Sequence, residues 1–272
     1  MHQPLRSYNL SGLNVKNISR DQHRWFPHSQ QPSLAASLQL YCFPFAGGSA
    51  STYQRWANSL PNYVDVVPVE LPGRGMRFRE PAVTSLSQLV EAMMEPLGER
   101  LRGPFAFFGH SMGAAICFEL ARHVRRKFGL SPAHLFLSAR PGPRVPETRA
   151  PTYNLPEAEF IEEIQRLNGT PAEVMASPEL MRLLSPMLRA DFQLNQTYQY
   201  EPGAPLSCPI TVFGGLDDDH VSRETLFAWR EETSAAFKLR MLPGDHFFLR
   251  TAESLLLRFL SETLSTIVST TS

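Results

Sequence analysis

The chain has 272 residues, of which 43% are hydrophobic, and its 26 basic residues balance its 26 acidic residues. This length predicts one large domain with a sizeable core. Without a basic surplus we expect no nucleic-acid partner, and the sequence has no run of about 18 apolar residues that could cross a membrane. Its three cysteines are widely spaced, which predicts neither a disulfide framework nor a zinc site and suggests a cytoplasmic protein.

The first residues of the chain differ in composition from the rest. Residues 1–23 are polar and aperiodic, and they lack the apolar stretch of a secretory signal. We therefore expect a loose tail over 1–23 and one domain over 24–272.

From residue 38 onward, short apolar runs alternate with segments of helical periodicity. We predict six strands, at Leu38–Phe45, Val64–Leu71, Pro104–Gly109, Ala133–Arg140, Pro209–Gly215 and Phe237–Gly244. We predict helices at Ser51–Leu60, Ser85–Arg102, Ala114–Gly129 and Ala252–Val268. Strands that are apolar throughout and separated by helices are typical of a mostly parallel sheet covered on both faces, so the predicted fold class is α/β.

One segment interrupts this alternation. Residues 141–205 begin with a proline-rich stretch and continue with helical patterns at Glu157–Leu167 and Ser177–Leu194. We predict a helical insertion between two strands, which in enzymes often forms a lid over the site. The alternative is that its helices only pack on the sheet.

The sequence Gly109-His110-Ser111-Met112-Gly113 places a serine between two glycines, after an apolar run and before a helical pattern. A nucleophile elbow requires this context, with the serine on a strained turn at the carboxyl end of a strand. Glycines suit the flanking positions because side chains there would clash where strand and helix approach. We therefore predict that Ser111 is a nucleophile.

A serine hydroxyl needs a base, and in this architecture the base follows the serine and the acid along the chain. Only His220 and His246 come late enough. His246 lies between the last predicted strand and the last helix, which suits a base carried on a loop. His220 directly follows acidic residues, and we expect it at the surface. We predict that His246 accepts the proton of Ser111.

The acid that orients the base should follow the preceding strand. Asp217, Asp218 and Asp219 come directly after the predicted strand Pro209–Gly215. We expect at least one of them to turn inward and hold His246. The residue pattern alone does not choose among the three.

A glycine-containing loop, Phe45-Ala46-Gly47-Gly48, follows the first predicted strand. In this architecture such a loop supplies half of an oxyanion hole, and glycines let the backbone approach the reacting carbonyl closely. The expected donors are the backbone N–H groups of Ala46 and of Met112, the residue after the nucleophile.

Several ordered motifs resemble the stand-alone type II thioesterases of polyketide and nonribosomal peptide assembly lines, with medium-chain acyl carrier protein thioesterases as close relatives. The motifs extend from about Trp25 to the last helix, and they comprise CFPFAGGSAS, LPGRGMR, FGHSMGA, LFLSAR, LRADF, CPITVFGG and PGDHFFL.

The resemblance implies an α/β-hydrolase fold with a helical lid and a triad of Ser111, Asp218 and His246. It places the acid at Asp218, with Asp217 as the fallback. One departure is Phe45, where many members carry histidine. Because the expected oxyanion donor is a backbone N–H, this change should alter local polarity and leave the chemistry in place.

The resemblance also implies an activity, the hydrolysis of acyl thioesters from the phosphopantetheine arm of acyl or peptidyl carrier proteins. Type II enzymes remove aberrant or stalled acyl groups from a synthase. No metal or diffusible cofactor is needed, and we expect a monomer with carrier domains as partners. The alternatives are a thioesterase that releases a finished medium-chain or cyclic product, an esterase of small esters, and a catalytically inactive hydrolase fold that binds a ligand or partner.

Carrier domains are usually acidic beside the serine that bears the pantetheine, so we expect a basic rim near the entrance. The candidates are Arg74, Arg77 and Arg79 after the second predicted strand, and Arg140, Arg144 and Arg149 at the start of the insertion. The alternative is that these arginines serve only solubility.

Overall fold

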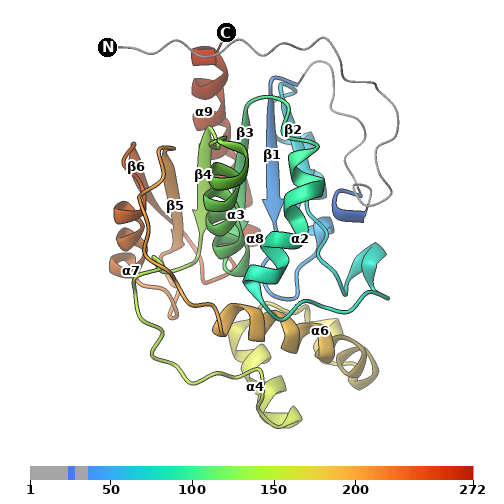
Figure 1. Ribbon diagram of the computed structural model, residues 1–272. Coiled ribbons are helices and arrows are strands. Elements are labelled where there is room, and N and C mark those ends of the chain that lie inside the picture. Colours follow the sequence, from blue (N-terminus) through green and yellow to red (C-terminus); the bar gives the residue numbers. More distant parts are fainter. Residues whose placement is uncertain (1–23, 28–35, 272) are drawn as a thin grey trace.

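The structure is a computed structural model that describes residues 24–27 and 36–271, so the tail predicted over 1–23 lies outside the described residues. Six parallel strands form a sheet in the order β2-β1-β3-β4-β5-β6 (Figure 1). They are β1 (Leu38–Phe43), β2 (Val64–Pro68), β3 (Phe105–His110), β4 (His134–Ser138), β5 (Ile210–Gly215) and β6 (Phe237–Leu242). The sheet confirms the predicted fold class, and β1 stops before Pro44 because proline has no N–H to donate.

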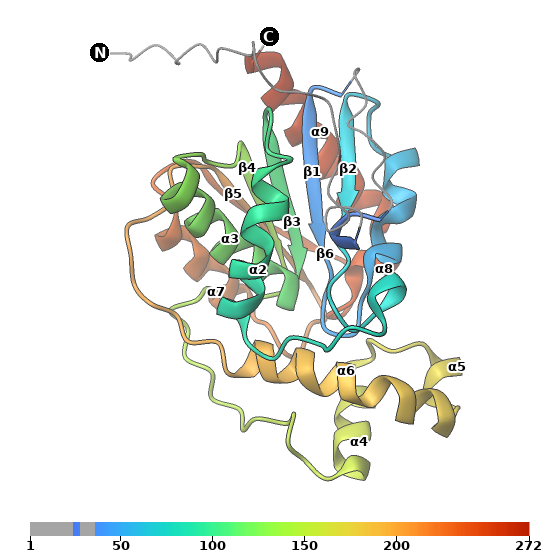
Figure 2. The same cartoon turned by 45° about the vertical axis from the view of Figure 1, so that its right-hand side comes forward.

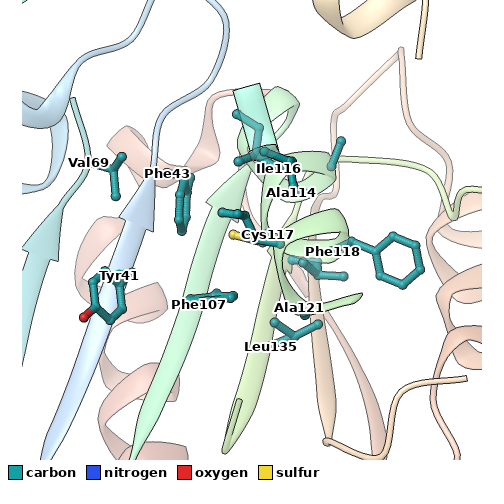
Figure 3. Packing of buried hydrophobic residues seen from close by; sticks show 14 of the residues in the cluster. Tyr41, Phe43, Val69, Phe107, Ala114, Ile116, Cys117, Phe118, Ala121 and Leu135 are labelled. Carbon is teal, nitrogen blue, oxygen red and sulfur yellow. The ribbon is translucent and has the colours of Figure 1, made fainter. Parts of the chain in front are cut away.

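Helices cover both faces of this sheet (Figures 1 and 2). The long ones are α2 (Leu86–Gly98), α3 (Met112–Phe128) and α9 (Glu253–Thr271). Tyr41 and Phe43 belong to one buried cluster with residues of α2 and α3 on one face, and Figure 3 shows Phe43 and Phe107 on the side of the sheet where Cys117 of α3 lies. Leu40 and Cys42 pack with α9 on the other face. Successive residues of a strand point to opposite faces, so burial on both sides explains why the runs are apolar throughout.

Two predicted helices differ from the structure. The segment predicted as a helix at Ser51–Leu60 is the 3-10 helix η1 (Ala50–Asn58). Its buried residues are Ala50, Tyr53 and Trp56, and this spacing fits three residues per turn better than 3.6. The helix α2 ends at Gly98, short of the predicted Arg102, because glycine is a poor helix former.

The segment between β4 and β5, which we call the insertion, carries the two helical patterns predicted for it. Its helices are α4 (Glu157–Leu167), α5 (Ala172–Met175) and α6 (Pro178–Gln196). They share an apolar cluster made of Phe160, Ile164, Met181, Met187 and Leu188. Figures 1 and 2 place the insertion beyond the carboxyl ends of the strands, where parallel sheets carry their sites.

Short helices complete the described chain: η2 (Gly75–Arg77), α7 (Arg223–Phe227), η3 (Ala228–Glu232) and α8 (Phe248–Thr251). None of the helices in residues 24–27 and 36–271 is long and apolar enough to span a membrane. Over the same residues, no cluster of three His, Cys, Asp or Glu side chains could hold a metal ion. Cys42, Cys117 and Cys208 are buried, and each has a free thiol.

Candidate active site

Ser111 occupies the sharp turn between β3 and α3. Its φ of 53° lies in the left-handed region, which costs a non-glycine residue on the order of 1–3 kcal/mol. The Ser111 N–H donates to the Ser138 carbonyl of β4 (2.7 Å), and the Ala114 N–H donates to the Ser111 carbonyl (3.0 Å). The turn therefore has the strand–turn–helix geometry of a nucleophile elbow.

Close packing explains the two glycines of the elbow. A Cβ on Gly109 would overlap the carbonyl group of Gly113, and a Cβ on Gly113 would overlap the carbonyl group of Phe43 at the end of β1. The elbow thus packs directly against the strand that leads into residues 45–48, which we call the oxyanion loop.

Both predicted oxyanion donors have an unused N–H. Met112 is the first residue of α3, where backbone N–H groups lack a helical acceptor and the helix dipole is positive. Within the described residues, neither Met112 nor Ala46 donates its N–H to a protein acceptor. Two such groups beside one elbow are what a developing oxyanion requires.

Asp218 and His246 meet just beyond the ends of β5 and β6. The two strands pair in register as far as Gly215 and Leu242, so the loops that follow them run side by side. The His246 Nδ1 lies 2.8 Å from the Asp218 Oδ2. Because a carboxylate only accepts, Nδ1 carries the proton, and Nε2 is left as the basic nitrogen.

Asp218 is the inward-facing member of the acidic run. Its side chain is fully buried, whereas Asp217 and Asp219 are exposed. Burial raises the pKa of Asp218, but the hydrogen bond from His246 and two from backbone N–H groups lower that pKa overall. The carboxylate therefore stays ionised and can hold the imidazole tautomer.

Two further histidines flank His246. The ring centroid of His110 lies 5.5 Å from that of His246, which places His246 beside the residue that precedes the elbow serine. Burial, with the nearby His246 and Arg250, lowers the pKa of His110 well below its usual range, so its ring is neutral.

The expectation for His220 was wrong. It is half-buried, and its ring centroid lies 6.1 Å from that of His246. The His220 N–H donates to the Asp218 Oδ1 (2.8 Å), and this turn folds His220 back toward the site. An aspartate often accepts from the N–H two residues further along, so Asp218 in the sequence could have predicted that the chain turns here.

The ring of Phe45 forms an apolar wall beside these histidines. Phe45 is 5% exposed, and its ring centroid lies 5.9 Å from that of His110 and 5.0 Å from that of Phe247. The Arg250 guanidinium lies 5.3 Å from the same ring. Phe45 therefore presents an apolar aromatic ring to this side of the site.

Five of the six arginines predicted for a basic rim contact polar groups of the protein, but only Arg74 and Arg77 are buried, whereas Arg144 and Arg149 are exposed. Arg74 and Arg77 are buried and pair with Asp191 and Glu80. In the second group the contacts are Arg140 with Asn195, Arg144 with Glu232, and Arg149 with Glu147. Arg79 is exposed and makes no ion pair with the described residues, so it alone of the first group fits the predicted rim.

Comparison with known proteins assigns this arrangement to a family. A family model described as a thioesterase domain matches residues 38–264. The gramicidin S biosynthesis protein GrsT of Aneurinibacillus migulanus is 43% identical over 246 residues, which are 90% of this chain and 96% of that protein.

Solved structures agree with the sequence relatives. The type II thioesterase BorB from the borrelidin biosynthetic cluster has a TM-score of 0.81 and 36% identity, covering 90% of this chain and 99% of that one. ClbQ from the colibactin pathway has a TM-score of 0.81 and 31% identity, covering 85% and 98%. The chain belongs to the thioesterase family of α/β-hydrolase enzymes.

Proposed function

We propose that this thioesterase is a stand-alone type II enzyme that removes acyl groups from acyl or peptidyl carrier proteins, acting as a monomer in the cytoplasm. The observation that carries the proposal is the 2.8 Å contact between His246 and Asp218 beside the strained turn that holds Ser111. The similar proteins from gramicidin S and borrelidin biosynthesis support a place in nonribosomal peptide or polyketide synthesis.

In the first step, the Ser111 Oγ attacks the thioester carbonyl carbon while the His246 Nε2 takes its proton. The negative charge on the carbonyl oxygen is stabilised by the N–H groups of Ala46 and Met112. The C–S bond then breaks, the thiol leaves with the proton from His246, and the acyl group stays on Ser111 as an ester.

In the second step, His246 takes a proton from water, which attacks the ester carbonyl. The same two N–H groups stabilise the oxyanion, the bond to the Ser111 Oγ breaks as His246 returns the proton to that oxygen, and the free acid leaves. Asp218 remains ionised throughout and stabilises the imidazolium. No step of this route calls for a metal or a diffusible cofactor.

We infer that the insertion forms the lid over this site and contacts the acyl chain. It lies beyond the carboxyl ends of the strands and brings an apolar cluster that includes Phe160, Ile164 and Met187. An editing enzyme must accept several short acyl groups, whereas a cyclising enzyme must hold one long chain and exclude water.

The test is to compare acetyl-, propionyl- and long-chain acyl-carrier thioesters as substrates of the full chain. We expect several short acyl groups to be hydrolysed, and none by Ser111→Ala. A strong preference for one full-length chain would instead indicate product release. A folded wild-type protein that hydrolyses no thioester would indicate an inactive scaffold.

A further inference from the structure

Helix α6 of the insertion touches the oxyanion loop. Leu188 and Asp191 are three residues apart on α6 and therefore share a face. The Gly47 N–H donates to the Asp191 Oδ2 (2.8 Å), and a Cβ on Gly47 would meet the Leu188 Cδ2 at 2.6 Å. Gly47 has a φ of 80°, so both the backbone and the close approach of α6 require glycine.

A buried ion pair completes this contact. Asp191 is 1% exposed and Arg74 is 5% exposed. The Arg74 Nη1 donates to the Asp191 Oδ2 (2.7 Å), and Nη2 donates to Oδ1 (2.6 Å). Nη1 also donates to the Gly48 carbonyl (3.1 Å). The bidentate pair thus holds two consecutive residues of the oxyanion loop, Gly47 by its N–H and Gly48 by its carbonyl.

These contacts leave one donor in the loop. The Gly47 N–H is used by Asp191, and the Gly48 N–H donates to the Phe45 carbonyl (2.8 Å). Among the three N–H groups of residues 46–48, only that of Ala46 has no acceptor in the part of the chain that the structure describes. The peptide group between Ala46 and Gly47 is therefore held by Asp191 of the insertion.

We propose that Asp191 and Arg74 are positioning residues that couple the docking of α6 to the orientation of the Ala46 N–H. This inference rests on the proposed function, because it takes Ala46 as an oxyanion donor. Donors stabilise a developing charge only when they are fixed before the charge forms. Hydrolysis then requires that α6 packs against the oxyanion loop. When α6 moves away from this loop, the oxyanion hole of the enzyme is incomplete.

The test replaces the pair by apolar residues of similar size, in the double variant Arg74→Met/Asp191→Leu. A matched apolar replacement of a buried ion pair is often neutral for stability, so the fold should survive while the Gly47 acceptor is lost. With an acyl-N-acetylcysteamine thioester as the probe, we expect kcat to fall about 10²-fold, the usual cost of losing an oxyanion donor, with KM within about threefold.

Asp191→Asn is the conservative variant, because its amide oxygen can still accept from the Gly47 N–H. It should recover most of the lost activity, to within about tenfold of the wild-type kcat. The matched control is Glu232→Gln, since Glu232 is a 2% exposed acid whose side chain bonds to Arg144 (2.7 Å) and Tyr200 (2.8 Å) and to no described residue of the oxyanion loop. It should lower the melting temperature and leave kcat unchanged.

A double variant that keeps the wild-type kcat, or loses activity only through KM, would overturn the inference. If the double variant does not fold, Asp191→Asn decides. Asparagine keeps an acceptor for the Gly47 N–H but cannot accept both Arg74 nitrogens, so a partial loss of kcat, of up to about tenfold at constant KM, supports the proposal, and an unchanged kcat overturns it. Failure of the proposed function would look different. Either the wild-type protein would not hydrolyse the probe, or the Ser111→Ala variant would still hydrolyse it.

Discussion

The two halves of the site are supported by different parts of the molecule. On the base side, Asp218 and His246 lie on loops that follow two paired strands, and they contact each other directly. On the oxyanion side, the loop after β1 is held from outside the sheet, by Asp191 of the insertion. Strand register brings the two loops of the base side together, whereas the placement of the Ala46 N–H depends on how the insertion docks. The base side should therefore keep its geometry when the insertion moves.

The largest effect is expected on the base side, from Asp218→Asn. The amide would favour the wrong imidazole tautomer and leave the imidazolium unstabilised, so kcat should fall about 10⁴-fold. Asp217→Asn and Asp219→Asn are matched controls in the same run, because both side chains are exposed. Steady-state kinetics on one thioester would measure all three. Equal losses in the three variants would contradict the assignment of Asp218.

Acid pH should destabilise the fold through His134, at the start of β4 and away from both halves of the site. Burial and the charge of Lys238 lower the pKa of His134 from 6.5 to about 4. Between these values the unfolded chain binds the proton and the folded chain does not, so stability falls as pH falls. The shift corresponds to about 3 kcal/mol of unfolding free energy by pH 4.

Urea unfolding of the wild-type protein and of His134→Gln, each at pH 7 and pH 4, measures this contribution of His134 to the free energy of unfolding. The wild type should lose about 3 kcal/mol more than the variant. The same pH slope in both proteins would show that His134 does not carry the effect.

Gly113→Ala probes the contact between the elbow and the strand that leads into the oxyanion loop. The new Cβ would overlap the Phe43 carbonyl group, and overpacking of this kind costs about 1–3 kcal/mol. Gly103→Ala is the control, because a Cβ there meets nothing within 4 Å. Urea denaturation should show a loss for Gly113→Ala only, together with a lower kcat. Equal urea midpoints for the two variants would contradict the close packing of Gly113 against the Phe43 carbonyl group.

The smallest effect is expected where α4 meets the base side. The Asn168 Nδ2 donates to the Asp245 Oδ2 at 3.3 Å, and this contact is exposed. Asn168 has a φ of 57°, so Asn168→Gly removes the hydrogen bond without straining the backbone. We expect kcat to stay constant and KM to change by less than about threefold, because exposed hydrogen bonds contribute little. A kcat loss as large as that of Asp191→Asn would mean that α4 also positions the site.

Much of the fold and of the base side could be predicted from local patterns. Apolar runs gave the six strands, because a sheet covered on both faces needs apolar residues at every position. The glycines around Ser111 predicted the elbow. The order of acid and base along the chain predicted His246 as the base and left Asp218 as one of three candidates for the acid. The sequence predicted an ordinary α-helix for η1, because in so short a segment the apolar spacing hardly distinguishes 3.0 from 3.6 residues per turn.

The support of the oxyanion side could not be predicted in the same way. Asp191 lies 144 positions from Gly47 and 117 from Arg74, and no periodicity connects them. The LPGR and RADF motifs contain Arg74 and Asp191, but the sequence placed Arg74 in a surface rim, whereas the residue is buried against Asp191. A long-range buried ion pair leaves no local signal, since its cost and its gain both arise only in the folded protein.

Mapping the site of a fluorophosphonate adduct by mass spectrometry of the full-length protein tests whether Ser111 is the activated nucleophile of this thioesterase. The account predicts one adduct, on the peptide that contains Ser111, formed much more slowly in Asp218→Asn and absent in Ser111→Ala. An adduct on another residue, or none on the folded wild-type protein, would contradict it.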